Sequence, residues 1–125
     1  LDKTLLPSFE ALFYEPFYQF LRQQCLAHEM ERAGELAADR VTLVHICPAH
    51  NSDFQMVTSA ELRPLGDSVT EVWERLVRER DRFIHVHTED LFGHFPIGQY
   101  SALQSWWEHL TMRYPWVTEA GVASH

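Results

Sequence analysis

The sequence predicts a small α/β fold, a βαβ-type unit with two or three strands and three main helices. Three patterns support it: a long helical run after Glu15-Pro16, two short runs rich in β-branched residues, and a run with helical spacing between those two. Two buried strands separated by a crossover helix imply parallel pairing in a right-handed unit. A sheet of so few strands has edges that need covering.

The first half of the chain supplies one helix and one strand. A helix is expected over Pro16–Ala33, because proline suits a first helical turn, and it should stop at Gly34. Residues 1–13 form a mixed lead-in. The near-continuously apolar run 40–48 is typical of a strand covered on both faces. A further short strand is expected at 54–57, within the connection that follows.

The second half supplies the crossover helix, a strand and a last helix. Ser68 and Glu71 form a capping-box signature before apolar residues at helical spacing. Residues 82–90 are predicted to contain the second strand, and 97–115 the last helix. The adjacent pair Trp106-Trp107 should pack that helix, one indole inward and one at a flank. Residues 116–125 are expected to form a frayed tail.

Length and composition predict one compact unit. The chain has 125 residues and 46% apolar residues, which fits a single domain or domain fragment. It opens on Leu1, as a processed fragment, an excised domain or a chain with a trimmed initiator region would. The longest apolar runs fall short of the 18 or so residues of a membrane helix, and no signal sequence is evident. We therefore expect a cytoplasmic protein without membrane contact.

The charge balance bears on nucleic-acid binding. The formal net charge is -8, with ten basic and eighteen acidic residues. Because neutralisation of phosphates supplies most non-specific affinity, this chain is not expected to hold DNA by itself. Any contact with DNA should come through a full-length protein.

Histidine and cysteine are the candidate reactive groups of the sequence. His85 and His87 share a face of the second strand, and His45 could lie beside them on the first. Neither a CxxC pair nor an HExxH run is present, so no metal site is predicted. Cys25 and Cys47 are expected to be reduced and buried structural thiols.

Two adjacent glutamines lie in the first helix. At about 100° per residue, Gln23 falls on the predicted inward arc, one turn beyond Gln19, and Gln24 falls toward a flank. The amide of Gln23 has two interpretations. It is satisfied locally as a structural group, or it orients a substrate or catalytic partner.

The segments YEPFYQFLRQQCLAHEMERAG and VTLVHICPAHNSDF resemble the C-terminal half of a family in the PD-(D/E)XK nuclease-like superfamily, over Phe13 to Phe92. The resemblance implies the latter part of a restriction-endonuclease-like core. The Pro16–Ala33 helix would follow the catalytic hairpin, and Val41–Cys47 would be the next core strand. Gln23, with Gln19 second, would be an accessory residue of the active site.

The sequence departs from that family in one respect. The motif needs Asp, then Glu or Asp, one residue, and Lys, with the acidic pair holding a divalent metal. Lys3 is the sole lysine and Leu1 precedes it by two residues, so the motif cannot be complete. Glu61-Leu62-Arg63 has the spacing, but it lies in a connection and arginine cannot act as a base.

Three hypotheses follow for the function. The first is the C-terminal part of a nuclease-like protein, not catalytic by itself, with no cofactor in this chain and Mg²⁺ in an active full-length enzyme. Its partner would be the missing N-terminal half or a second copy of the chain. The second is a small self-associating α/β interaction module without enzymatic activity. The third, a free-standing hydrolase using histidine or cysteine, has least support.

Overall fold

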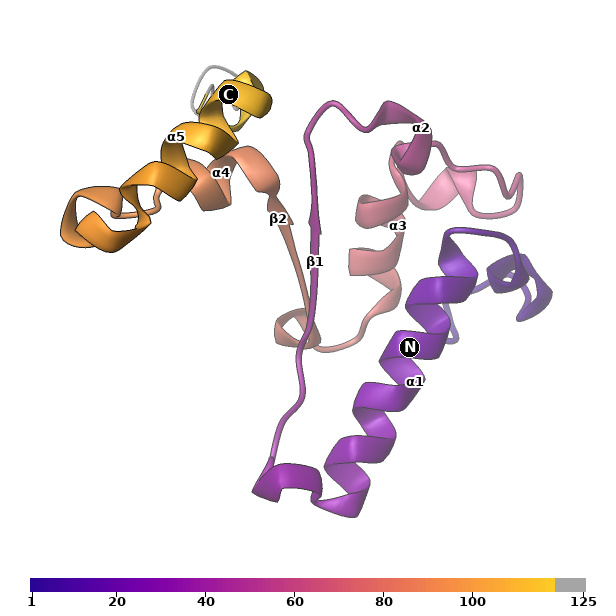
Figure 1. The fold of residues 1–125 in the computed structure, drawn as a ribbon. Coiled ribbons are helices and arrows are strands. Elements are labelled where there is room, and N and C mark those ends of the chain that lie inside the picture. The colour runs from indigo at the N-terminus through magenta and orange to yellow at the C-terminus, as the bar shows by residue number, and fades with distance from the viewer. Residues whose placement is uncertain (119–125) are drawn as a thin grey trace. The chain divides into compact units, whose positions relative to one another are not determined.

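The computed structural model describes residues 1–118 and has a mixed α/β architecture, as predicted (Figure 1). Two compact units are present, one formed by Leu1–His45 with Asn51–His85, the other by Ile46–His50 with the described residues from Val86 onward. The number of independently folding domains stays a prediction. In chain order the helices and strands are α1 (Phe17–Ala33), β1 (Leu43–Cys47), α2 (Ser52–Gln55), α3 (Val69–Leu76), β2 (Phe83–His87), α4 (Thr88–Gly93) and α5 (Gln104–Arg113).

Helix α1 forms where the sequence predicted it. Pro16 is its N-cap, and Gly34 ends it in the left-handed conformation at φ 63°. The Gly34 N–H donates to the carbonyls of Met30 and Glu31, which satisfies two of the last turn's acceptors. The buried or half-buried positions of this helix recur every three or four residues along one face: Phe17, Phe20, Leu21, Gln24, Ala27, Met30 and Glu31.

The two strands pair in parallel and form a two-stranded sheet within residues 1–118. Their register places His45 beside His85. Helices α1 and α3 lie on one side of the strands (Figure 1). On the other side, Val44 is 50% exposed and Ile84 is 45% exposed. The prediction that the first strand is covered on both faces is therefore wrong, because side chains alternate along a strand and only one row meets the helices.

The connection between β1 and α3 also differs from the prediction. The strand expected at 54–57 is replaced by the short helix α2, which Asn51 starts by accepting a hydrogen bond from the Phe54 N–H. The capping box of α3 is confirmed, since Ser68 and Glu71 exchange both hydrogen bonds. That helix ends at Leu76, where the following residue is extended.

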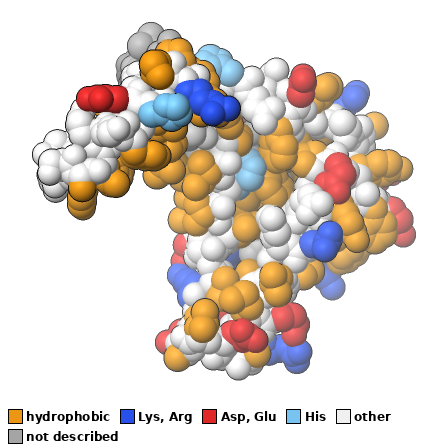
Figure 2. Space-filling model, in the orientation of Figure 1, with side chains coloured by type: hydrophobic (Ala, Val, Ile, Leu, Met, Phe, Trp, Pro, Cys, Tyr) orange, Lys and Arg blue, Asp and Glu red, His pale blue; other side chains and the backbone are white. Residues whose placement is uncertain are grey.

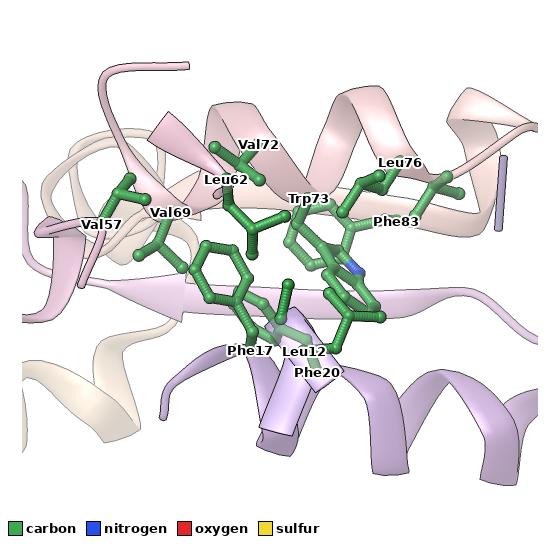
Figure 3. Packing of buried hydrophobic residues seen from close by; sticks show 12 residues of the cluster. Leu12, Phe17, Phe20, Val57, Leu62, Val69, Val72, Trp73, Leu76 and Phe83 are labelled. Atoms are coloured by element: carbon green, nitrogen blue, oxygen red, sulfur yellow. The ribbon is translucent and has the colours of Figure 1, made fainter. Parts of the chain in front are cut away.

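The core of the first unit joins α1, α3 and β2 (Figure 3). Phe20 is its centre, with ring centroids 5.5 Å from Trp73 and 5.3 Å from Phe83. Leu12, in a 3₁₀ turn over Glu10–Phe13, is 0% exposed. The lead-in 1–13 thus contributes to this core, which its mixed sequence did not indicate.

The second unit packs aromatic side chains around α4 and α5. The predicted helix 97–115 forms only over α5, after two 3₁₀ turns. Trp107 is half-buried and Trp106 is 45% exposed, as predicted for one inward and one outward indole. Residues Pro115–Thr118 form a 3₁₀ turn in which Val117 is 2% exposed. The rest of the predicted tail, 119–125, lies outside the described residues.

At the ends of the strands, the second unit has a buried carboxylate. Glu89, in α4, is 6% exposed. Both of its oxygens accept from the Ala49 N–H, at 3.1 and 3.0 Å, just beyond the end of β1. Within residues 1–118 no helix is long and apolar enough to cross a bilayer.

Candidate functional site

The two predicted site residues on α1 lie on its outer surface. Gln23 and Gln19 are both exposed, and the Gln19 amide donates to Glu15 one turn earlier, at 3.4 Å. Gln24 is the half-buried glutamine instead. The prediction that Gln23 faces inward is therefore wrong. The inward row of α1 passes through Gln24, one turn beyond Phe20.

Gln24 faces the start of β2. Its Nε2 donates to the carbonyl oxygen of Arg82 over a long 3.5 Å. Its Oε1 is buried and has no hydrogen-bond partner in the structure. Buried amide oxygens without a partner are uncommon and cost free energy. The Gln24 Oε1 is thus a free acceptor, able to receive a hydrogen bond from a group that the described residues do not supply.

A charged contact lies about two turns further along α1. It is here named the Glu31 junction and is formed by Glu31, Val41, Glu79 and Arg82. The Glu31 carboxylate accepts from the Arg82 guanidinium and, at 2.9 Å, from the Val41 N–H. Arg82 also pairs with Glu79 through its Nε, at 3.1 Å. Val41 precedes β1 and Arg82 precedes β2, so one carboxylate fixes the beginnings of both strands to α1.

A groove of about 510 Å³ opens beside this junction. Its lining includes Lys3, Gln24, His28, Glu31 and Arg82. The only lysine of the chain therefore shares a groove with an inward glutamine and a carboxylate. That carboxylate is already paired with Arg82. Among residues 1–118, no three carboxylates converge at metal-binding distance.

A pair of histidines occupies the inner face of the sheet in the first unit. The Nδ1 atoms of His45 and His85 are 3.1 Å apart, which confirms the predicted adjacency of these two residues. The His45 ring also stacks on Phe54, with centroids 4.9 Å apart, and meets Phe20 edge-on at 5.0 Å. Burial among these rings, and then the neighbouring His85, lower the pKa of His45 below its usual 6.5.

The remaining sequence candidates are structural or exposed. Cys47 is buried as predicted, whereas Cys25 is exposed, so the prediction of two buried thiols is wrong for Cys25. Glu61 accepts a hydrogen bond from the Ser8 hydroxyl at 2.9 Å, in a connection and away from both strands. It does not meet a second acidic group in the manner of a metal-binding hairpin.

Comparison with known protein families is decisive at this point. The sequence matches the family described as "restriction endonuclease associating with ARP" over residues 2–115. The chain belongs to this family. No curated protein and no solved structure matches it.

Membership of the restriction endonuclease associating with ARP family confirms the predicted relationship to restriction endonucleases. The match covers both compact units, including α5, which lies beyond the Phe13 to Phe92 range of the resemblance. The narrower assignment, to the C-terminal half of a PD-(D/E)XK core, stays a prediction.

The Glu31 junction makes a first prediction. Replacing Glu31 by Gln should lower the free energy of unfolding by about 2 kcal/mol, because Arg82 and the Val41 N–H lose a charged acceptor. The two side chains are only 16% and 23% exposed, so solvent screens their contact poorly. Urea unfolding followed by circular dichroism measures the change.

The matched control for this variant is Glu29→Gln. Glu29 pairs with Arg32 on the outer face of α1, where its side chain is 55% exposed. Its loss should change the free energy of unfolding by less than about 0.5 kcal/mol. Equal effects of the two substitutions would show that the Glu31 junction contributes no more than a surface ion pair.

The lowered pKa of His45 makes a second prediction. Between pH 6.5 and the lower folded-state pKa, the unfolded chain binds a proton that the folded chain resists, so stability falls as the pH falls through this window. His45→Gln removes this contribution and should flatten the decline. Unfolding free energies at pH 7 and pH 5, in buffer with EDTA, test it. His28→Gln, at an exposed position of α1, should retain the decline.

Proposed function

We propose that this chain is the scaffold part of a PD-(D/E)XK nuclease fold and is not catalytic by itself. The observation that carries the proposal is the composition of the motif. Lys3 is the only lysine, and the residue two positions before it is Leu1, so no complete D…(D/E)xK motif exists in these 125 residues. The acidic strands and their Mg²⁺ would belong to a segment outside them.

The sheet supports this proposal. Within residues 1–118, β1 pairs only with β2, and isolated pairs of strands are marginally stable in water. The outward row of the sheet carries Val44 and Ile84, which are both about half exposed. A further strand beside β1 would extend the sheet and form hydrogen bonds with the backbone N–H and C=O groups on the free edge of β1. A catalytic hairpin preceding α1 in the fold would supply such a strand.

In this proposal, Gln24 takes the accessory role that the resemblance implied for Gln23 and Gln19. It lies on the inward row of α1, and its Oε1 accepts no hydrogen bond from the described residues. A water molecule or a substrate group held at the adjoining segment could donate to this oxygen. Gln23 and Gln19 are both exposed.

DNA cleavage by two forms of the protein tests the proposal. With Mg²⁺ present, the isolated chain should cleave supercoiled or linear DNA no more than it does in an EDTA control. The full-length protein should cleave it, and Gln24→Ala within it should lower the rate about tenfold. The matched variant Gln23→Ala should leave the rate unchanged. Cleavage by the isolated chain, or equal effects of the two variants, would contradict the proposal.

A second candidate function is an interaction module. The exposed apolar side chains favour it: hydrophobic residues reach the surface on the face shown in Figure 2. By their exposed fractions, Val44 and Ile84 are the apolar residues on the outer row of the sheet within the first unit. The family description itself names association with ARP. In this alternative, the sheet is covered by another protein molecule and no nuclease activity follows.

For the isolated chain we expect self-association through the sheet. Val44→Lys should shift the molar mass toward the monomer, because a charge on the outer row opposes pairing of sheets. Light scattering after size-exclusion chromatography measures this at several concentrations. Leu36→Lys, at a residue that is 92% exposed and away from the strands, is the control. A monodisperse monomer at every concentration would contradict the expectation.

The full-length protein separates the two candidate functions. If its own segments cover the sheet, Val44→Lys should destabilise it without changing its oligomeric state. If the sheet is an interface between molecules, the same substitution should dissociate the assembly and leave folding intact.

A further inference from the structure

A second groove of the first unit gathers three arginines. It measures about 650 Å³, all of its lining residues belong to the first unit, and they include Asp2, Leu5, Arg75, Arg78, Arg80 and Phe83. Arg75 lies in the last turn of α3, and Arg78 follows the end of that helix by two residues. Arg80 begins the 3₁₀ turn that precedes β2. Three of the chain's ten basic residues therefore line one groove.

The walls of this groove are fixed to one another. The Asp2 N–H donates to the Leu76 carbonyl oxygen at 2.7 Å, so the lead-in segment lies against the end of α3. Phe83, the first residue of β2, is 3% exposed and belongs to the core. Leu5 is 43% exposed and gives the groove an apolar edge. The arginines are thus carried by backbone segments whose positions the core defines.

The three groove arginines have no carboxylate partner within residues 1–118. Other arginines of the chain do have one. Glu79 lies between Arg78 and Arg80 in the sequence, but its carboxylate pairs with Arg40 and Arg82 instead. This is unexpected in a chain with eighteen acidic and ten basic residues. The guanidinium N–H donors of the groove are therefore left for water or for a ligand.

Two acidic residues of the groove are held by local donors. The Glu71 carboxylate accepts from the Ser68 N–H at 3.2 Å, as part of the capping box of α3. The Asp2 carboxylate accepts from the Thr4 hydroxyl at 2.6 Å and from the Thr4 N–H at 2.9 Å. Glu74 is exposed and forms no ion pair within residues 1–118. These carboxylates thus flank the arginines without pairing with them.

The chemistry of the groove selects a compact anion. A guanidinium group has five N–H donors in a planar fork that matches the oxygens of a phosphate group. Sites for small molecules have volumes of about 300–1,000 Å³, a range that includes this groove. The carboxylates of Asp2, Glu71 and Glu74 would repel the further phosphates of an extended polyanion such as DNA. A short anion that stays between the arginines avoids this repulsion.

We propose that this groove binds a compact diphosphate group, either as inorganic pyrophosphate or as part of a small molecule, through Arg75, Arg78 and Arg80. The bound group joins the end of α3 to the turn before β2 and so stabilises the first unit. The site goes beyond the proposed nuclease role and does not rest on it.

Hydration is the competing explanation for the unpaired arginines. Arginine is mostly exposed in proteins and needs no ligand at the surface. Arg78 also acts on Asp2 through its charge: the pKa of Asp2 lies below its usual 3.8, first because of the hydrogen bonds from Thr4 and to a smaller extent because of Arg78. The two explanations differ in an observable way, because a groove that is only hydrated does not bind pyrophosphate.

Calorimetric titration of the chain with inorganic pyrophosphate at low salt tests the proposal. We expect one bound ion per chain and a rise in the unfolding temperature as pyrophosphate is added. Sodium chloride should weaken the binding, because the contacts are charged and partly exposed. A parallel titration with ADP distinguishes the two sources of the diphosphate. Stronger binding of ADP would assign its organic part to the apolar edge at Leu5, and equal binding would restrict recognition to the diphosphate itself.

Arginine variants locate the site. Replacing Arg75, Arg78 or Arg80 by Gln should each weaken pyrophosphate binding by about tenfold or more, because a charged donor is lost. Arg22→Gln, at an exposed arginine of α1 outside the groove, is the matched control and should bind as the original chain does.

Glu74→Gln tests the sign of the charge effect. This substitution removes a negative charge from the groove and should strengthen pyrophosphate binding several-fold. A residue with a purely structural role would not produce such a gain. Circular dichroism shows whether each variant is folded.

Three outcomes would overturn the proposal. The first is absence of saturable pyrophosphate binding by the original chain at low salt, which requires no variant. The second is binding that Arg22→Gln weakens as much as the groove variants do, which would indicate a general charge effect. The third is a DNA duplex that binds through the same arginines when pyrophosphate does not, which would assign the groove to a nucleic-acid backbone. DNA cleavage is measured separately, so failure of this proposal and failure of the proposed function are distinguishable.

Discussion

The Glu31 carboxylate is the contact on which the first unit depends. It binds the guanidinium of Arg82, at the start of β2, and the peptide N–H of Val41, just before β1. Both strands therefore begin against the same point of α1. From there the inward row of the helix runs back through Ala27 and Gln24 to Phe20, whose ring meets the core and the His45 imidazole.

A similar device is present in the second unit. Glu89 accepts the N–H of Ala49 just after β1, as Glu31 accepts that of Val41 just before it. In a wide sheet, neighbouring strands satisfy the backbone groups at strand ends. Here only one neighbour is present among residues 1–118, and carboxylates occupy two of those positions. Side chains thus replace part of a hydrogen-bond ladder, which is consistent with a sheet that is completed by another polypeptide segment.

Local chemistry explains which elements were predictable. Gly34 ends one helix and the Ser68–Glu71 capping box starts another, and each signal lies within a few residues of sequence. Runs of β-branched residues likewise indicate both strands. The inward face of α1 was not predictable in this way. Leu26 is apolar but 61% exposed, whereas Gln24 and Glu31 are polar and face inward. The helix face that is most apolar in sequence is therefore not the face that packs against the core. Only the tertiary partner, Arg82, explains polar residues on that face.

The strand expected at 54–57 did not form for a related reason, since the Asn51 cap outweighed the β-propensity of the residues after it.

The distribution of tryptophan has a practical consequence for following the protein in solution. Of its four indoles, Trp73 is the one in the first unit and is 0% exposed, while Trp106, Trp107 and Trp116 belong to the second. A chain that keeps only Trp73, with phenylalanine at the other three positions, would have a single tryptophan fluorophore, buried in the core of the first unit. Its emission would report the melting of that core alone, and comparison with the far-ultraviolet signal would reveal whether the two halves of the polypeptide lose their structure in one cooperative step.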